Sequence, residues 1–151
     1  MALDAAQIID AVVSHAAASG WFDRVNQHEP KNAPPYGLTA AVWVDEIRPA
    51  QSSGLDSTSA LLVLNVRLYT SMLQEPQDAI DPNLVAASSV LFAAYSGDFS
   101  LGGEARHVDL LGAEGAPLRA RAGYLNQDQK LYRVMTITLP VIVNDAWDQA
   151  A

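Results

Sequence analysis

An alternation of side-chain character with a period of two runs through the end of the chain, over residues 130–144. The side chains on one side are Arg133, Met135, Ile137, Leu139, Val141 and Val143, and those on the other are Tyr132, Val134, Thr136, Thr138, Pro140 and Ile142. This alternation, rich in β-branched residues, predicts a strand. At about 3.3 Å per residue it would span roughly 40 Å, far more than a usual strand of about 5–6 residues. We therefore expect it to bend, change partners or project from its domain, with pairing on one side lapsing near Pro140, which has no N–H group.

Two more strands are predicted earlier in the chain, over residues 38–48 and 58–70. Both are rich in β-branched and other apolar side chains. The second is apolar on both sides in its first half, which is typical of a central strand covered on both faces. Residues 49–57 between them are small and polar and predict a flexible connection.

A helix is predicted at the start of the chain, over residues 4–19. Asp4 suits the N-cap, Gln7 makes a capping box with it, and Gly20 suits the end of the helix. The Pro-rich residues 23–37 that follow predict a loop. A loop of about 15 residues usually serves a function or packs on a neighbour.

A second helix is predicted over residues 82–96, with Asp81 as its N-cap and Pro82 at its first position. The helix carries no charge on any side, and its large apolar residues surround a run of small ones. A helix that is apolar all round is expected to be buried all round. In a chain of this length, this indicates either a contact with a neighbouring subunit or a position between the sheet and the first helix. The candidate interface residues on the helix are Ala86, Ala87, Val90 and Ala94.

The last third of the chain predicts a three-stranded meander, formed by residues 107–111, residues 117–123 and the final strand. Symmetric turns over residues 112–116 and 126–129 predict specific cross-strand neighbours: Leu110 with Leu118, Asp109 with Arg119, Arg119 with Thr136, and Ala120 with Met135. Both registers collect the same polar side chains on one face: Asp109, Arg119, Arg121, Thr136 and Thr138. A slip of one residue would destroy this agreement, because it would move every side chain to the other face.

These elements predict an α+β fold, in which two main helices pack on a mixed, mainly antiparallel sheet of about five strands. Residues 1–151 are expected to form a single domain. Within it we expect the Pro-rich loop over residues 23–37 and a C-terminal tail over residues 144–151.

Composition and charge narrow the class of protein. Half of the residues are apolar and 17% are charged, which excludes a disordered chain. Nine Lys and Arg stand against 17 Asp and Glu, a net charge of −8 that repels nucleic-acid phosphate. The chain has no cysteine, so disulfides and thiolate metal sites are excluded. No segment reaches the roughly 20 apolar residues of a membrane span, and we expect no signal peptide.

The sequence offers no convincing active site, so we expect no catalysis, no metal and no cofactor. His15 suits a helix face, His28 lies in the Pro-rich loop and His107 in the meander, and no two of them are close enough in sequence to chelate a metal. A hydrolase is disfavoured because no G-x-S-x-G motif is present. Arg119 and Arg121 could clamp an anion, but a cross-strand pair with Asp109 is the simpler interpretation.

The size of the chain, its order of elements and its last strand resemble the tail terminator proteins of long-tailed, siphovirus-type phages. The stretch that carries the resemblance is residues 130–147, KLYRVMTITLPVIVNDAW, which looks like the closing strand of that family with its polar, aromatic-bearing end. The opening helix, the strand pair within residues 38–70 and the helix over residues 82–96 match the order of elements in the family.

The resemblance implies an α+β subunit of the virion that is assembled in the host cytoplasm as a homohexameric ring on the end of the tail tube. Such a ring stops polymerisation of the tube protein and joins the tail to the head–tail connector or stopper protein. DNA would pass through its lumen without specific binding. The resemblance implies no catalytic residue, no cofactor and no membrane contact.

Two sets of contact residues follow as hypotheses. Subunit contacts would use the helix over residues 82–96 together with Arg119, Arg121 and Asp109. The connection between the first two strands would contact the tube or the connector through Gln51, Ser52, Ser53, Gly54 and Leu55.

Two alternatives stay open. A head–tail connector or stopper protein of the phage neck would share the same size and build. In a different class, a small cytoplasmic ligand-binding α+β domain would form a two-fold dimer, with its pocket between the sheet and the helix over residues 82–96. That domain would melt at a higher temperature with its ligand bound.

Overall fold

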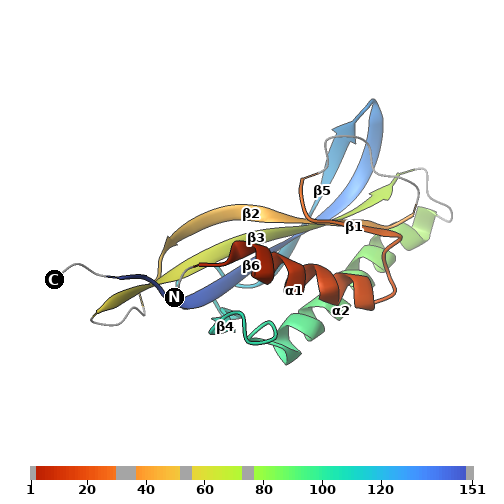
Figure 1. The fold of residues 1–151 in the computed structure, drawn as a ribbon. Helices are drawn as coiled ribbons and strands as arrows, with labels where there is room; N and C mark the ends of the chain where they lie inside the picture. Colours follow the sequence, from red (N-terminus) through yellow and green to blue (C-terminus); the bar gives the residue numbers. More distant parts are fainter. Residues whose placement is uncertain (1–2, 30–36, 52–55, 73–76, 149–151) are drawn as a thin grey trace.

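The computed structural model describes residues 3–29, 37–51, 56–72 and 77–148. The elements in this part of the chain are α1 (Ala5–Ala18), β1 (Arg24–Asn26), β2 (Thr39–Pro49), β3 (Ser57–Ser71), the 3-10 turn η1 (Gln77–Ala79), α2 (Ile80–Gly97), β4 (His107–Val108), β5 (Arg119–Gln127) and β6 (Lys130–Asp148) (Figure 1).

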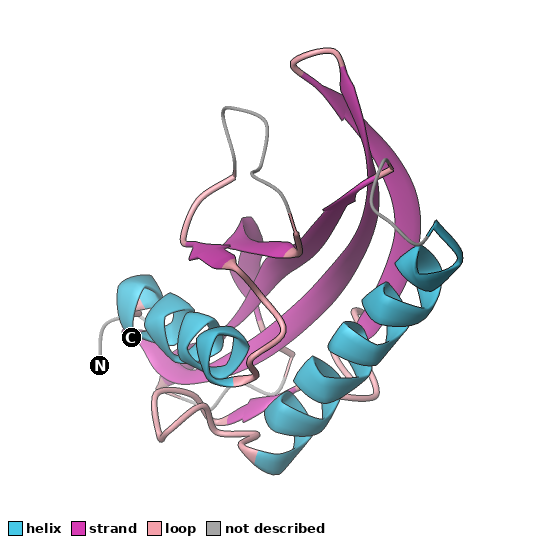
Figure 2. Ribbon diagram, turned by 90° about the vertical axis from the view of Figure 1, so that its right-hand side faces the viewer, coloured by secondary structure: helices cyan, strands magenta, loops and turns pink. Residues whose placement is uncertain are grey.

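The strands form one sheet in the order β1-β2-β3-β6-β4, and β5 also pairs with β6. β1 and β2 are parallel, and all other pairs are antiparallel. Both helices lie on the same face of this curled sheet (Figure 2). The predicted α+β class, with a mixed and mainly antiparallel sheet, is therefore confirmed. β1 lies in the stretch that was expected to be a loop. The prediction missed it because three residues are too few to give a periodic pattern.

β6 is the strand that ties the sheet together. It pairs with β3 along one edge over nearly its whole length of 19 residues. On its other edge it pairs first with β5, from Lys130 to Thr138, and then with β4, at Val141 and Ile142. The predicted change of partners is confirmed. β6 also runs to Asp148, so residues 144–148 belong to the strand and not to a tail.

Pro140 lies where β6 changes partners. Its carbonyl oxygen accepts a hydrogen bond from the Asp109 N–H at 2.9 Å, on the edge that β4 and β5 share. In an antiparallel strand the N and C=O of one residue point to the same edge, so the nitrogen of Pro140 points to this edge too. It lies between the segment that pairs with β5 and the segment that pairs with β4, where no N–H donor is needed. The predicted lapse in pairing near Pro140 is confirmed.

The main core lies between the two helices and the face of the sheet that they cover. Its fully buried side chains are Ile8, Val12 and Ala16 of α1, Leu84, Ala87, Leu91 and Tyr95 of α2, Leu62, Leu64, Val66 and Leu68 of β3, and Ile137, Leu139 and Val141 of β6. The strand residues alternate in sequence, as the period of two predicts. Burial of one Leu or Ile side chain contributes about 1.5–3 kcal/mol.

The ends of α1 are as expected, whereas the start of α2 is not. Asp4 caps α1 by accepting a hydrogen bond from the Gln7 N–H at 3.2 Å, and Gly20 has a φ of +78° just beyond the helix. α2 begins at Ile80, directly after η1, with Ala79 at its N-cap. Asp81 is therefore not the cap but lies in the first turn, where its carboxylate pairs with the Arg133 guanidinium at 3.0 Å.

The predicted meander is wrong as a strand pair in its first half, although the Leu118 N–H does donate to the carbonyl of its predicted neighbour Leu110 at 3.2 Å. β4 and β5 do not pair as neighbouring strands but lie one after the other along the same edge of β6. The Asp109 carboxylate, which was expected to face Arg119, accepts hydrogen bonds from the N–H groups of Ala113 and Glu114 at 3.0 and 2.9 Å. These bonds coil the chain into a loop that a straight strand could not follow.

The hairpin of β5 and β6 is present as predicted, but its register is shifted by two residues. Its turn is made by Asp128 and Gln129 alone, both with positive φ, as in a tight two-residue hairpin. Thr136 is therefore opposite Arg121 rather than Arg119. A shift of two residues leaves every side chain on its predicted face, so Arg119, Arg121, Thr136 and Thr138 still share one.

Candidate functional site

The face of the sheet turned away from the helices, here called the outer face, is covered only in places. Toward the hairpin it carries a small apolar cluster that includes Ala41, Tyr69, Tyr132 and Val134. Further along β3 and β6 it carries a second cluster of Ala50, Leu61, Val63 and Ile142, against which Ala116 of the coiled loop packs. The part between the two clusters is polar.

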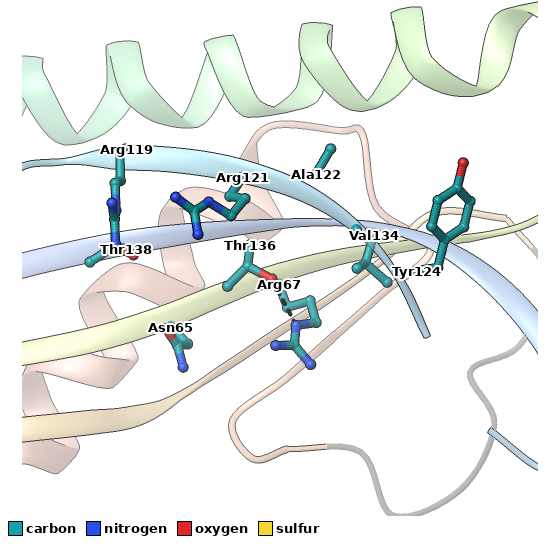
Figure 3. A pocket seen from close by; sticks show the side chains of 10 residues that line it. Asn65, Arg67, Arg119, Arg121, Ala122, Tyr124, Val134, Thr136 and Thr138 are labelled. Atoms are coloured by element: carbon teal, nitrogen blue, oxygen red, sulfur yellow. Dashed lines mark hydrogen bonds between the residues drawn. The ribbon is translucent and has the colours of Figure 1, made fainter. Parts of the chain in front are cut away.

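This polar part forms an open hollow of about 370 Å³ (Figure 3). Its lining residues come from β3, β5 and β6: Asn65, Arg67, Arg119, Arg121, Ala122, Gly123, Tyr124, Val134, Thr136 and Thr138. It contains three of the nine Lys and Arg residues of the chain, and no Asp or Glu is among the described residues that line it. We call it the arginine hollow.

The strand register explains why these side chains meet. Arg67 of β3 is opposite Thr136 of β6, which in turn is opposite Arg121 of β5. The neighbouring row consists of Trp43, Asn65, Thr138 and Arg119, in order across β2, β3, β6 and β5. Cross-strand neighbours on one face lie about 5 Å apart at Cβ, so the two rows converge on one polar surface.

Arg67 is held in place within the hollow. Its Nε–H donates to the Thr136 hydroxyl at 2.8 Å, and its guanidinium lies 5.2 Å from the centre of the Trp43 ring. Burial raises the pKa of the neighbouring Tyr69 hydroxyl, an effect that the charge of Arg67 partly offsets. Arg67 is therefore a pre-oriented cation, in contrast to a freely moving surface side chain.

Arg119 and Arg121 are exposed and reach from β5 toward β6 (Figure 3). Among the described residues, neither they nor Arg67 has a carboxylate within ion-pair distance. Asp109, which was expected to pair with Arg119, is only 4% exposed and bonds to its own loop. Three like charges in one hollow repel each other, which favours an anionic partner.

The side of α2 turned away from the sheet is the second surface of interest, after the arginine hollow. Residues 82–97 carry no charge, yet only one side of the helix is buried by the chain itself. On the outer side Val85 is 57% exposed and Val90 is 37% exposed, while Ala86 and Ala94 are half-buried. The expectation of burial all round is therefore not met within one chain. Ala87 is fully buried in the core and offers no surface to a neighbour.

Only one of the remaining predicted contact residues, Gln51, is described by the structure. Gln51 is exposed, and its backbone N–H donates to the Glu114 carboxylate at 2.7 Å. Ser52, Ser53, Gly54 and Leu55 lie outside the described residues.

The histidines are spread over the molecule. His15 of α1 bonds the Asp98 carboxylate just beyond α2 at 2.8 Å, His28 is exposed after β1, and His107 opens β4. The described residues contain no group of three or more metal-ligating side chains. Within the same residues, no helix is both long enough and apolar enough to cross a membrane.

The sequence pattern indicated two of the three arginines of the hollow. Arg119 and Arg121 stood out because they are two residues apart on a predicted strand. Arg67 and Trp43 were missed, although Asn65 and Arg67 interrupt an apolar strand at a spacing of two, which marks a polar patch on one face.

A scan of protein-family models finds none that matches this chain, and a search of curated proteins finds no significant match. A functional proposal for this chain therefore has to rest on its own residues and geometry.

Proposed function

We propose that the chain is a structural, ring-forming subunit of a phage tail, a tail terminator that caps the tail tube as a homohexamer in the virion. The proposal combines the resemblance of residues 130–147 with one structural observation, the uncharged outer side of α2. In this role the ring ends polymerisation of the tube and presents a face to the head–tail connector or stopper protein.

The outer side of α2 supports the proposal because it is unusual for the surface of a lone chain. From residue 82 to residue 97 it presents Val85, Val90 and small residues without one charged group, and the one carboxylate of the helix, Asp81 in the first turn, is paired with Arg133. An exposed apolar surface of this kind is typical of a contact with another protein. The small residues allow a second backbone to approach closely.

The acidic balance of the chain suits a ring around DNA. A net charge of −8 disfavours lasting contact with phosphate, so DNA can pass without being held. A closed ring also needs heterologous contacts, which join two different surfaces of each subunit. α2 and the outer face of the sheet lie on opposite sides of the molecule and offer two such surfaces (Figure 1).

Native mass spectrometry of the purified chain tests the proposal, both alone and with tail tubes of the cognate phage added. A chain of 16.1 kDa gives a hexamer of about 97 kDa (six times 16.1). We expect this species in free solution or on tube ends, and we expect added chain to stop tube growth.

A closed two-fold dimer that melts at a higher temperature with a small ligand would contradict the proposal and favour the ligand-binding alternative. Rings that bind the connector but leave tube growth unchanged would instead favour a connector or stopper protein.

A further inference from the structure

We infer that the arginine hollow is a docking site for the acidic end of a neighbouring copy of this chain. The inference rests on the proposed ring and specifies one of its contacts. Its occupant is the tip where β3 begins and β6 ends, which we call the acidic tip, defined by Asp56, Asp145, Trp147 and Asp148.

The acidic tip is a two-stranded ribbon at one end of the molecule. Ser57 of β3 is opposite Asp148 of β6, and Thr58 is opposite Trp147. The tip extends beyond the helix-covered part of the sheet (Figure 1). Asp56, Asp145 and Asp148 are exposed, and no Lys or Arg lies within residues 56–59 or 144–148.

The tip and the hollow complement each other in charge. Three exposed carboxylates at the tip correspond to three guanidinium groups with no acidic partner among the described residues. The guanidinium of Arg106 lies at the base of the tip, where it donates to Asn144 and to the Ser59 hydroxyl. Guanidinium and carboxylate form paired, charge-assisted hydrogen bonds, which add geometry to attraction. Trp147, 39% exposed at the tip, adds apolar area to a contact that would otherwise be purely ionic.

The two surfaces cannot meet within one chain. Thr136 in the hollow and Asp148 at the tip lie on the same strand, β6, twelve residues apart (148 minus 136). At about 3.3 Å per residue this separates them by roughly 40 Å. A contact between them is therefore intermolecular and joins two different surfaces. Repeated from copy to copy, it generates a ring where the rotation closes.

The same arginines could bind free phosphate or the phosphates of DNA, and the charge of the whole chain argues against DNA. A net charge of −8 repels a phosphate backbone at long range. The acidic tip, in contrast, belongs to the same chain, so every hollow is accompanied by one tip. The hollow lies on three adjacent strands and presents an open, polar surface to a ribbon of two strands.

Charge reversal on each surface separately, followed by mixing, tests the inference. One variant carries Arg119→Glu and Arg121→Glu, and the other carries Asp56→Arg and Asp148→Arg. All four side chains are exposed and none is in the core, so both variants should melt like wild type. Native mass spectrometry at matched concentrations, alone and with tube ends, measures the ring.

We expect each variant alone to form rings at least tenfold less readily than wild type, since like charges would then meet at every contact. A one-to-one mixture should restore rings, because each tip then finds a hollow of opposite charge only on the other variant. These rings should contain three copies of each. Arg24→Glu with Glu104→Arg is the matched control: both residues are exposed, lie outside the two surfaces and should leave ring formation unchanged.

The other outcomes are distinct. Rings that form normally from both reversed variants overturn the inference and leave the proposed function standing. Loss of rings in the arginine variant without rescue by mixing also overturns it, as does binding of inorganic phosphate or duplex DNA by wild type that only the arginine variant loses. Wild type that forms no ring, alone or on tubes, contradicts the proposed function and with it this contact.

Discussion

At the scale of single residues, the most informative groups are buried polar atoms. The Tyr95 hydroxyl is fully buried and has no hydrogen-bond partner among the described residues. Burial holds its pKa well above the usual value for tyrosine. Its ring makes an edge contact with His15, with ring centres 5.9 Å apart, so the aromatic body has a packing role and the hydroxyl has none that we can identify.

Replacement of Tyr95 by Phe should therefore stabilise the protein. The variant keeps the ring contact and removes a hydroxyl whose lost hydration costs about 1–3 kcal/mol when no bond replaces it. We expect the free energy of unfolding in urea to rise by about 1 kcal/mol, with an unchanged dependence on denaturant. A loss of stability would show that the hydroxyl has a partner, such as a buried water. Tyr69→Phe is the matched control, because it removes a tyrosine hydroxyl that does have a hydrogen-bond partner, Arg67.

Asp98 connects the two helices and carries a pH dependence. Its carboxylate accepts a hydrogen bond from the Gly102 N–H at 3.0 Å and pairs with His15 at 2.8 Å, and these two partners lower its pKa. A carboxyl group with a lowered pKa in the folded state stabilises the fold above its unfolded pKa, which is about 3.9. That contribution disappears as the pH falls through the folded value.

We therefore expect Asp98→Asn to melt at a lower temperature than wild type at pH 7, with a difference that narrows progressively below about pH 4. Thermal melts across this range measure the effect. Glu104→Gln removes an exposed carboxylate instead and should give no such convergence. A difference in melting temperature that is constant from pH 7 to pH 2 would show that the charge of Asp98 is not responsible.

At the scale of elements, the loop between β4 and β5 decides how the outer face is covered. Asp109 bonds the loop to itself, while Arg48 of β2 donates to the Glu114 carbonyl at 2.6 Å and the Glu114 carboxylate bonds Gln51. Held in this way, the loop places Ala116 over Leu61, Val63 and Ile142. One buried carboxylate thus keeps an apolar patch out of water.

Asp109→Ala should destabilise the protein by about 2 kcal/mol, because two backbone N–H groups lose a charged acceptor. Equilibrium unfolding measures the loss. Hydrogen exchange should show faster exchange at Ala113 and Glu114, with α1 unaffected. Asp109→Asn keeps one acceptor oxygen and should lose less. Equal losses in the two variants would mean that the carboxylate acts through something other than these bonds.

At the scale of the whole molecule, the sheet extends past the helices at both ends, with the hairpin at one and the acidic tip at the other (Figure 1). This shape leaves α2, the arginine hollow and the tip accessible at the same time. Each lies on a different part of the surface, which is the arrangement that a head-to-tail assembly requires.

Val90→Glu should reduce ring formation while the chain stays folded, since a charge on the outer side of α2 would be buried in the proposed contact. Val90 is the correct position for this test because Ala87, also predicted to lie at the interface, is inside the core, where Glu would unfold the chain. Native mass spectrometry and a thermal melt measure the two effects. Leu111→Glu, at a residue 94% exposed on the loop, is the control. Normal rings from Val90→Glu would place the interface away from α2.

The sequence by itself determined most of the long elements and the faces of their strands. Periodicity identified β2, β3 and β6, local capping chemistry located α1, and the period of two put Arg119, Arg121, Thr136 and Thr138 on one face even though the register was shifted by two residues. These features depend on near neighbours in the chain, so the local pattern is sufficient.

Only the tertiary structure decided which distant segments meet. The partner of β4 and the buried side of α2 depend on contacts between residues far apart in sequence, and so does the anchoring of the coiled loop by Arg48, which bonds the Glu114 carbonyl 66 residues away. The arginine hollow has the same origin: Arg67 and Arg121 are 54 residues apart (121 minus 67) and come together because β6 lies between their strands. Periodicity assigns a side chain to a face, but strand order decides its neighbours on that face.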